Sequence, residues 1–294
     1  MKTRTIRLLI ALAFMALVPA CATTPSHPDL PKKPVKIALV LGAGAAKGFA
    51  HVGVIKILEA QKIPIHMIVG TSSGSFVGCL YAYGYDGYAL QGIALALQKK
   101  DVAELTIPDN GFVKGERLRD FINTKVHNLP IEKFKIPFYA IATDIKSGEG
   151  IVFNSGNAGM AVQASSAVPG VYQPAKFSGT SYVDGGVVNP LAVDVARKYG
   201  ADVVIAVDIT YGVDATVPTS TMETVMKSME IMYNKISQIP VSQADVVIRP
   251  KVGFVRAADF NSRNAAILEG EKAASATIPK INAILDKLRQ EGRL

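Results

Sequence analysis

Residues 65–83 read IHMIVGTSSGSFVGCLYAY, and three kinds of sequence follow one another within this stretch. The apolar run over 65–69 has the length and the branched residues of a buried strand. The glycines at positions 70 and 74 then permit a sharp turn, and the small and apolar residues over 73–83 favour a helix. A strand that enters a helix through a tight turn is the repeating unit of parallel α/β sheets.

The sequence on both sides continues this alternation. Upstream, the apolar run VKIALVL over 35–41 predicts a strand, and a glycine-rich loop leads into a predicted helix over 48–61. We therefore expect a three-layer α/β/α sandwich with a largely parallel central sheet, whose ligands bind at the carboxyl ends of the strands. Further strands are predicted over 138–145, 203–209 and 246–249, and further helices near 115–126, 157–166, 192–199 and 264–289.

The composition is that of an ordinary globular protein. The 294 residues are 49% hydrophobic and 19% charged, and two cysteines are too few for a disulfide scaffold. The formal net charge of +8 includes three bases near the N-terminus, and the other bases are scattered, which argues against nucleic acid binding. The glycine-rich loop has Lys47 where a dinucleotide fingerprint needs glycine, and it lacks a Gly-Lys-Ser/Thr phosphate loop, so we expect no nucleotide.

The N-terminus has the pattern of a secretory signal. Basic residues precede an apolar run over 8–18, so we interpret residues 1–20 as a signal peptide of lipoprotein type, with cleavage before Cys21. A lipidated Cys21 would anchor the protein to a membrane surface, at the outer membrane of a bacterial cell envelope and facing the periplasm, with residues 21–34 as a flexible tether. Ala20-Cys21-Ala22 also fits ordinary signal peptidase, which would give a soluble periplasmic or secreted protein.

The turn after the second predicted strand matches the G-x-S-x-G pattern of a nucleophile elbow. It consists of Gly70, Thr71, Ser72, Ser73 and Gly74, and it lies between a predicted strand and a predicted helix, as the pattern requires. The flanking glycines would expose the Ser72 hydroxyl above the sheet. The alternative is a serine-rich helix cap, and of the two serines Ser73 is the expected capping residue.

A serine nucleophile needs a base, and the positions of the histidines exclude one familiar arrangement. No histidine follows a candidate acid in the Ser-Asp-His order of α/β-hydrolases, and His51 and His66 are interpreted as structural. The base is therefore expected to be a carboxylate. The candidate is Asp184, which is followed by Gly185 and Gly186, although an Asp-Gly pair is also typical of a hairpin turn.

The loop after the first predicted strand suits an anion. Its residues 42–48 read GAGAAKG and open the helix predicted over 48–61. Unpaired backbone N–H groups at such a position hold an anion or a developing oxyanion, and a plain tight turn is the alternative. The candidate oxyanion residues are Gly42, Gly44, Ala45, Ala46, Lys47 and Gly48.

Three motifs therefore occur in order, namely the glycine loop over 42–48, the GTSSG turn over 70–74 and the DGG turn over 184–186. Together they resemble the patatin-like phospholipase family, and the blocks GFVKG over 111–115 and ASSAVPG over 164–170 agree with this resemblance. Residues 35–210 are thus expected to form a patatin-like catalytic core. Residues 211–294 are expected to form an extension of helices and strand packed on the same domain.

The resemblance implies a serine acyl hydrolase of lipid esters, with phospholipase A or lysophospholipase activity, a dyad of Ser72 and Asp184, and no metal or cofactor. Asp184 would accept the serine proton, and backbone N–H groups around residues 44–46 would stabilise the oxyanion. Lys47 stands where the family has Arg or Lys, and it would orient the loop, meet a phosphate or stay solvated. The alternatives are an acyltransferase or a small-ester esterase on the same dyad, and a non-catalytic lipid-binding scaffold in the envelope.

Other polar and sulfur-containing side chains have simpler interpretations. Asp144 and Asp208 end predicted strands at the edge where ligands are expected, and they are interpreted as turn or capping carboxylates, with a role in supporting the catalytic residues as the alternative. Cys79 is expected to be a buried thiol. Methionines recur at helical spacing at positions 222, 226, 229 and 232, where they would form either a core face or a lid over an acyl pocket.

Overall fold

The structure of the protein is a computed structural model that describes residues 33–106, 110–212 and 217–294. Residues Pro34–Leu294 form one compact unit. The predicted signal peptide, Cys21 and nearly all of the predicted tether lie outside the described residues. In the described part of the chain, no helix has both the length and the apolar character that crossing a bilayer requires.

Within the described residues, eight strands form one sheet. Five adjacent strands run parallel to one another, namely β10 (Val246–Ile248), β9 (Val203–Val207), β1 (Ile37–Leu41), β2 (Met67–Thr71) and β5 (Phe138–Asp144). Strand β8 (Thr180–Asp184) pairs antiparallel with β5, and β7 (Ala175–Phe177) pairs antiparallel with β8. The prediction of a largely parallel sheet is therefore confirmed. A further strand, β6 (Gly150–Phe153), pairs antiparallel with β5. The order is β10 (Val246–Ile248), β9 (Val203–Val207), β1 (Ile37–Leu41), β2 (Met67–Thr71), β5 (Phe138–Asp144), β8 (Thr180–Asp184) and β7 (Ala175–Phe177).

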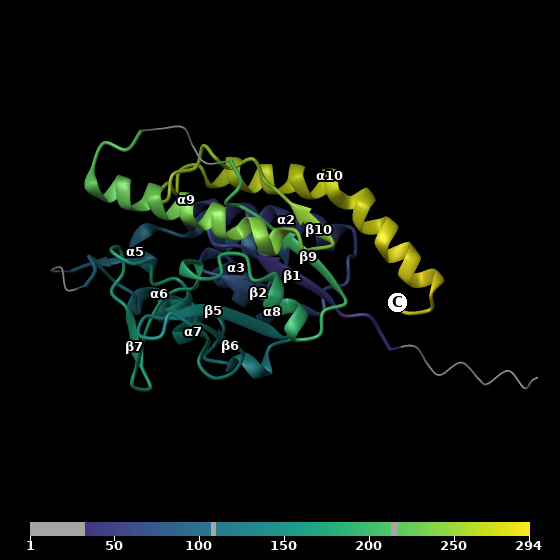
Figure 1. Ribbon diagram of the computed structural model, residues 1–294, viewed down its shortest axis with the longest axis horizontal. Coiled ribbons are helices and arrows are strands. Elements are labelled where there is room, and N and C mark those ends of the chain that lie inside the picture. The colour runs from purple at the N-terminus through teal and green to yellow at the C-terminus, as the bar shows by residue number, and fades with distance from the viewer. Residues whose placement is uncertain (1–32, 107–109, 213–216) are drawn as a thin grey trace, which may run out of the picture. The chain divides into compact units, whose positions relative to one another are not determined.

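Helices cover both faces of the sheet, which gives the three predicted layers (Figure 1). The alternation of side chains along a strand explains the two faces, because Ile37 and Leu39 belong to one apolar cluster, whereas Ala38 and Val40 belong to another. Both clusters are buried. The first cluster includes residues of α2 (Phe49–Ala60), α3 (Ser73–Tyr83), α4 (Gly87–Ala96) and α10 (Arg263–Gln290), and the second includes residues of α8 (Val193–Lys198).

The remaining elements are one long helix, several shorter helices and two short strands. The long helix α9 (Thr221–Val241) contacts α8 and η3 (Gly185–Val187), and α6 (Glu116–Lys125) packs on α7 (Ala158–Ser165). Two short strands pair as a small separate ladder. These elements are η1 (Ala45–Gly48), α5 (Lys99–Val102), β3 (Glu104–Leu105), β4 (Val113–Lys114), α6 (Glu116–Lys125), η2 (Ile131–Lys133), α7 (Ala158–Ser165) and η3 (Gly185–Val187).

The observed elements agree with the sequence where local signals are strong. The helix predicted over 73–83 is α3 with the same bounds, and the helix predicted from residue 48 is α2, preceded by the 3₁₀ turn η1. The strand predicted over 65–69 begins two residues later than expected, at Met67. The antiparallel strands β6, β7 and β8 were not predicted, because short, partly exposed strands lack a continuous apolar run.

Candidate active site

Two strands that are distant in sequence meet end to end along one edge of β5. Thr71, the last residue of β2, pairs with Ile141, and Asp184, the last residue of β8, pairs with the next residue, Ala142. Strand β6 pairs with the same stretch of β5 and therefore occupies its other edge. The parallel β2 and the antiparallel β8 thus end opposite each other, and Ser72, which follows Thr71, is brought to Asp184 by strand register.

Ser72 has the backbone conformation of a nucleophile elbow. Its φ of 55° and ψ of −123° place it in a region that a non-glycine residue seldom adopts and that costs about 1–3 kcal/mol. The turn is held from both sides, because the Ser72 N–H donates to Ser165 Oγ at 2.9 Å and the Ser72 carbonyl accepts from the Ser75 amide at 2.8 Å. A Cβ on Gly70 would lie 2.6 Å from the carbonyl oxygen of Gly74, so the predicted glycine is sterically required.

Ser73 does not cap α3, and that part of the prediction is wrong. It is the first residue of the helix, and its buried Oγ has no hydrogen-bond partner among the described residues. A capping side chain must belong to the residue before the first helical turn, and that position is Ser72. The Ser72 side chain caps nothing either, so its hydroxyl stays available at the positive end of an 11-residue helix dipole.

Asp184 is fully buried beside this hydroxyl. Its Oδ1 accepts hydrogen bonds from the Gly186 amide at 2.6 Å and from the Tyr233 hydroxyl at 3.2 Å. Burial raises the pKa of Asp184 from 3.8 to about 6, against the opposing effects of Ser72, the Gly186 amide and Tyr233. The Ser72 hydroxyl is thus close enough to affect the carboxyl, but no hydrogen bond of ordinary geometry reaches Oδ2, as is common in a site without substrate.

The glycine loop offers two backbone donors next to the nucleophile. The Ala46 amide already donates to the carbonyl of Ala257 at 3.1 Å, and the Lys47 amide donates to the carbonyl of Gly44. Within the described residues, the amides of Gly44 and Ala45 make no such bond. The predicted donor set around 44–46 is therefore reduced to Gly44 and Ala45, because the Ala46 amide is used to attach the loop to the segment before α10.

Both candidate histidines have structural roles, as the sequence predicted. The fully buried His51 donates from Nε2 to the carbonyl of Gly42 at 2.9 Å, and burial lowers its pKa to about 4, so the ring is neutral. His66 accepts from the amide of Ile37 through Nδ1 at 3.1 Å. His51 thus fixes the start of the glycine loop. Gly48, at the end of the same loop, lies against Ser73 of the elbow, where a Cβ would come within 2.5 Å.

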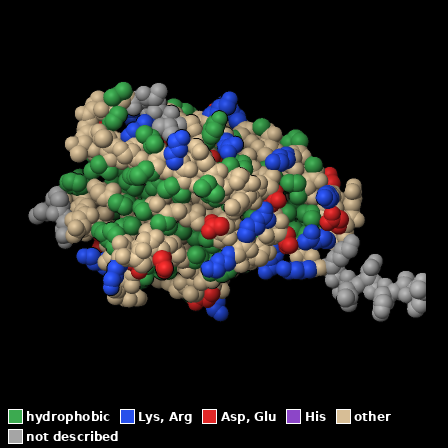
Figure 2. All heavy atoms as spheres, viewed as in Figure 1, with side chains coloured by type: hydrophobic (Ala, Val, Ile, Leu, Met, Phe, Trp, Pro, Cys, Tyr) green, Lys and Arg blue, Asp and Glu red, His purple; other side chains and the backbone are tan. Residues whose placement is uncertain are grey.

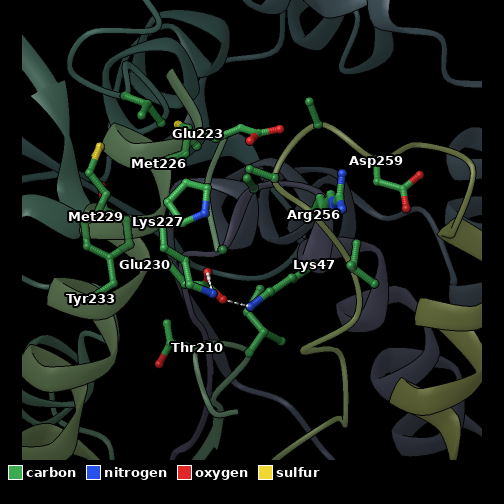
Figure 3. Close-up of a pocket in the computed structure, with 18 of the residues that line it drawn as sticks. Lys47, Thr210, Glu223, Met226, Lys227, Met229, Glu230, Tyr233, Arg256 and Asp259 are labelled. Carbon is green, nitrogen blue, oxygen red and sulfur yellow. Dashed lines mark hydrogen bonds and ion pairs between the residues drawn. The ribbon is translucent and has the colours of Figure 1, made fainter. Parts of the chain in front are cut away.

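Lys47 is buried and points from the loop towards α9. Its Nζ forms an ion pair with Glu230, and Lys227 lies 3.4 Å from the other oxygen of the same carboxylate. Figure 3 shows these side chains meeting at the wall of a cavity. Of the three interpretations of Lys47, a solvated side chain is excluded, because only 6% of the side chain is exposed.

A cavity of about 390 Å³ opens beside Ser72, at the carboxyl ends of the strands. Met222, Met226 and Met229 of α9 line it, and the last two are labelled in Figure 3. Met232 is 51% exposed and does not line the cavity. The predicted methionine stripe therefore divides into cavity-lining residues and one surface residue. Figure 2 shows that hydrophobic side chains gather on the face of the molecule that carries α9.

Three other expectations for polar and sulfur-containing side chains are confirmed. Asp144 accepts from the Lys146 amide at 2.8 Å, and Asp208 accepts from the Thr210 amide at 3.0 Å, so both are turn carboxylates. Cys79 is a buried thiol whose pKa is raised by burial. Among the described residues, no group of three or more His, Cys, Asp or Glu side chains is placed to hold a metal.

Sequence reasoning missed three residues of the site. Ser165 lies within the block over 164–170 that carried part of the resemblance, so its importance had a signal. Tyr233 and Glu230 had none, because both belong to α9 and reach the site only through tertiary packing. A strained serine, a buried carboxylate and two unpaired amides at an apolar cavity are the parts of a serine-nucleophile hydrolase.

Comparisons with known proteins agree with this class. Residues 39–197 match the family model described as patatin-like phospholipase. Lysophospholipase NTE1 of Coccidioides immitis is 33% identical over 235 residues, which are 77% of this chain and 15% of that protein. An uncharacterized NTE family protein of Mycobacterium bovis is 35% identical over 178 residues, which are 59% of this chain and 49% of that protein. The solved structure of VipD from Legionella pneumophila has a TM-score of 0.51 at 12% identity, over 85% of this chain and 67% of that one.

The chain belongs to the patatin-like phospholipase family, a family of lipid ester hydrolases, because the family model matches more than half of its residues. The likeness to VipD supports the fold alone. The chain spans at most about half the length of these two curated relatives. The segment matched by the family model ends before β9, β10, α9 and α10, so one wall of the cavity lies outside it.

Proposed function

We propose that the protein is a serine acyl hydrolase that cleaves lipid esters, with phospholipase A or lysophospholipase specificity. One observation carries the proposal: Ser72, on a strained elbow, lies beside the buried Asp184 at the wall of a cavity lined by methionines. An apolar cavity next to the nucleophile suits an acyl chain. Membership of the patatin-like phospholipase family gives independent support.

In the first half of the proposed reaction, Ser72 attacks the ester carbonyl. Asp184 takes the proton from Oγ as the new C–O bond forms, and the amides of Gly44 and Ala45 donate to the developing oxyanion. Collapse of the tetrahedral intermediate breaks the bond to the leaving alcohol, which receives the proton from Asp184. The products are an acyl-Ser72 ester and the deacylated lipid.

The second half repeats these roles with water. Asp184 takes a proton from a water molecule, and the resulting hydroxide attacks the acyl carbonyl while the same two amides hold the oxyanion. The bond between the acyl carbon and Ser72 Oγ then breaks, Oγ recovers the proton, and a fatty acid leaves. A carboxyl with a pKa of about 6 is mostly ionised at neutral pH and can therefore accept a proton, and its pKa is near enough to neutral pH for it to return that proton.

The test compares the wild-type protein with Ser72→Ala on mixed phospholipid vesicles, on lysophospholipid and on a short chromogenic ester. Release of free fatty acid by the wild type, lost in a folded Ser72→Ala protein, supports the hydrolase. The preferred substrate separates a lipase from a small-ester esterase. Ser75→Ala is a matched control, because it removes a hydroxyl that donates to the Ser72 carbonyl and not to the reacting ester.

Three results would contradict the proposal. Vesicle binding without turnover in both proteins would favour a lipid-binding scaffold, and turnover only when an acyl acceptor such as an alcohol is added would favour an acyltransferase. Equal activity in wild type and Ser72→Ala would exclude Ser72 as the nucleophile.

We also propose that Cys21 is lipidated and holds the protein at the bacterial outer membrane, facing the periplasm. The support is the signal-like sequence over 1–20 and the small residues around Cys21. Labelling of cells with a palmitate analogue is expected to mark the wild type and not Cys21→Ser. Unmodified protein in the soluble periplasmic fraction would instead support cleavage by ordinary signal peptidase.

A further inference from the structure

The two oxygens of the Asp184 carboxylate have different surroundings. Oδ1 accepts both of the donors that reach the group, the Gly186 amide at 2.6 Å and the Tyr233 hydroxyl at 3.2 Å. Oδ2 is buried and has no hydrogen-bond partner among the described residues. A carboxylate held twice through one oxygen keeps the other free to accept a proton.

Tyr233 is locked in this contact by packing. Only 8% of the residue is exposed, and a Cβ on Gly186 would lie 2.5 Å from its ring, so glycine at 186 leaves the space that the ring occupies. Burial and the neighbouring carboxyl both raise the pKa of the Tyr233 phenol, so the hydroxyl is a neutral donor at all working pH values. The contact joins α9 to the end of β8 over 49 residues of sequence.

We propose that Tyr233 is a positioning residue of the dyad, whose hydroxyl holds Oδ1 of Asp184 so that Oδ2 faces the Ser72 hydroxyl as proton acceptor. The inference rests on the Ser72–Asp184 dyad of the proposed function. Tyr233 lies outside the segment that matches the family model, because that segment, residues 39–197, ends before α9 begins. The match to the family model therefore does not include this residue.

The need for a second donor follows from the side chain itself. The terminal torsion of an aspartate has a broad energy profile, so one hydrogen bond from the Gly186 amide restrains one atom and leaves the carboxylate plane free to turn. The Tyr233 hydroxyl donates to the same oxygen from a second direction, so that turning the carboxylate plane breaks two hydrogen bonds instead of one. It also stabilises the ionised form, since a hydrogen bond to a carboxylate lowers its pKa.

The experiment uses Tyr233→Phe, which removes the hydroxyl and keeps the ring. Tyr85→Phe is the matched control, because the Tyr85 hydroxyl, in the loop between α3 and α4, donates to the backbone carbonyl of Lys125 at the end of α6 at 2.8 Å. The readout is the rate at which an alkyl fluorophosphonate modifies Ser72, measured from pH 4.5 to 9. In this reaction Oγ bonds to phosphorus, fluoride leaves with the P–F electron pair, and Asp184 takes the Oγ proton, so no lipid turnover is required.

Tyr233→Phe is expected to slow modification about tenfold at pH 6 and to move the acid limb of the pH profile upwards by about one unit, because the hydrogen bond that favours the ionised carboxylate is lost and a tenfold change corresponds to about 1.4 kcal/mol. Tyr85→Phe is expected to leave both unchanged. The same Tyr233 substitution on an Asp184→Asn background is expected to have no further effect. Hydrolysis assays on an accepted ester should show a lower kcat with an unchanged KM.

A purely structural role for Tyr233 predicts a different result. The melting temperature would then fall while the modification rate and the acid limb stayed at their wild-type values, and this outcome overturns the inference. If Tyr233→Phe does not fold, Tyr233→Met replaces it, since methionine removes the hydroxyl and still fills part of the buried space with apolar atoms, and the same shift is expected. A wild-type protein that reacts with the probe but hydrolyses no lipid ester would contradict the proposed function and leave this inference standing.

Discussion

Lys47 of the glycine loop and Glu230 of α9 form a largely buried ion pair, with 6% and 22% of their side chains exposed. The glycine loop, whose Gly44 and Ala45 amides have no partner among the described residues, is therefore held by α9 through Lys47 and by His51 through the Gly42 carbonyl. Removing one partner of such a pair leaves a buried charge uncompensated, which costs more than the pair contributes as a whole.

Glu230→Gln is expected to destabilise the protein by about 2–4 kcal/mol and to reduce turnover, because the Lys47 ammonium stays buried without its carboxylate. Chemical denaturation measures the stability change. Asp286→Asn is the control, since its pair with Arg289 is more than half exposed on both sides and contributes at most about 1 kcal/mol. Equal losses of stability in the two variants would show that the buried Lys47–Glu230 pair contributes no more than an exposed pair. A Lys47→Met, Glu230→Gln double variant should recover part of the stability, because it removes the uncompensated charge.

The activity is expected to fall below about pH 6 with the slope of a single proton, because protonated Asp184 cannot accept from Ser72. The pH dependence of kcat/KM on a neutral ester measures this limb. His51 cannot produce it, since its pKa is about 4. A limb that disappeared in a folded His51→Gln protein would assign the titration to the histidine and contradict the assignment to Asp184.

Asp184→Asn is expected to abolish turnover and yet to raise stability above pH 7. The folded-state pKa of about 6 lies above the ordinary value of 3.8, so protonation favours the folded protein below pH 3.8 and this contribution is lost as the pH rises through 6. At high pH the buried carboxylate thus costs about 3 kcal/mol, which an uncharged amide avoids. Unfolding curves at pH 8 and pH 4 test this: a stability gain that does not shrink towards pH 4 would exclude the electrostatic explanation.

Met226→Trp is expected to shorten the preferred acyl chain by several carbons, because the larger ring fills space in the cavity beside Ser72. A series of p-nitrophenyl esters of increasing chain length measures the preference as kcat/KM. Met232→Trp is the matched control on the same helix, where the side chain is exposed and outside the cavity. The same shift in both variants would mean that α9 changes as a whole rather than at the cavity wall.

The sequence predicted those parts of the site that are encoded locally. The elbow and α3 were predicted to the residue, because an apolar strand, two glycines and a helix-forming run lie next to one another. Asp184 was identified as a candidate because Gly185 and Gly186 follow it and because of the family resemblance. Nothing in the sequence indicated that β8 would run antiparallel to β5. The order of strands along β5 depends on short, partly exposed segments whose pattern is weak.

The contacts from α9 could not be predicted in this way. Tyr233 is one of 10 tyrosines, and nothing near it in sequence distinguishes it from the others. Its role arises from a hydrogen bond to Asp184, which lies 49 residues away in sequence, and from the space that the absent side chain of Gly186 leaves for the tyrosine ring. The assignment of Ser73 as a cap failed for a related reason, because a one-residue shift in the start of α3 decides which serine can cap it.

One helix thus carries two kinds of constraint a few turns apart. At Tyr233, α9 contacts the proton-accepting carboxyl of Asp184, so a substitution there is expected to reduce the catalytic rate. At Met222 and Met226 the same helix lines the cavity proposed for the acyl chain. Substitutions there are expected to change the substrate preference and to leave the catalytic reaction intact. Substrate preference can therefore change in evolution through substitutions in the N-terminal part of α9 alone. The same substitutions allow a protein engineer to alter the preference without disturbing the nucleophile.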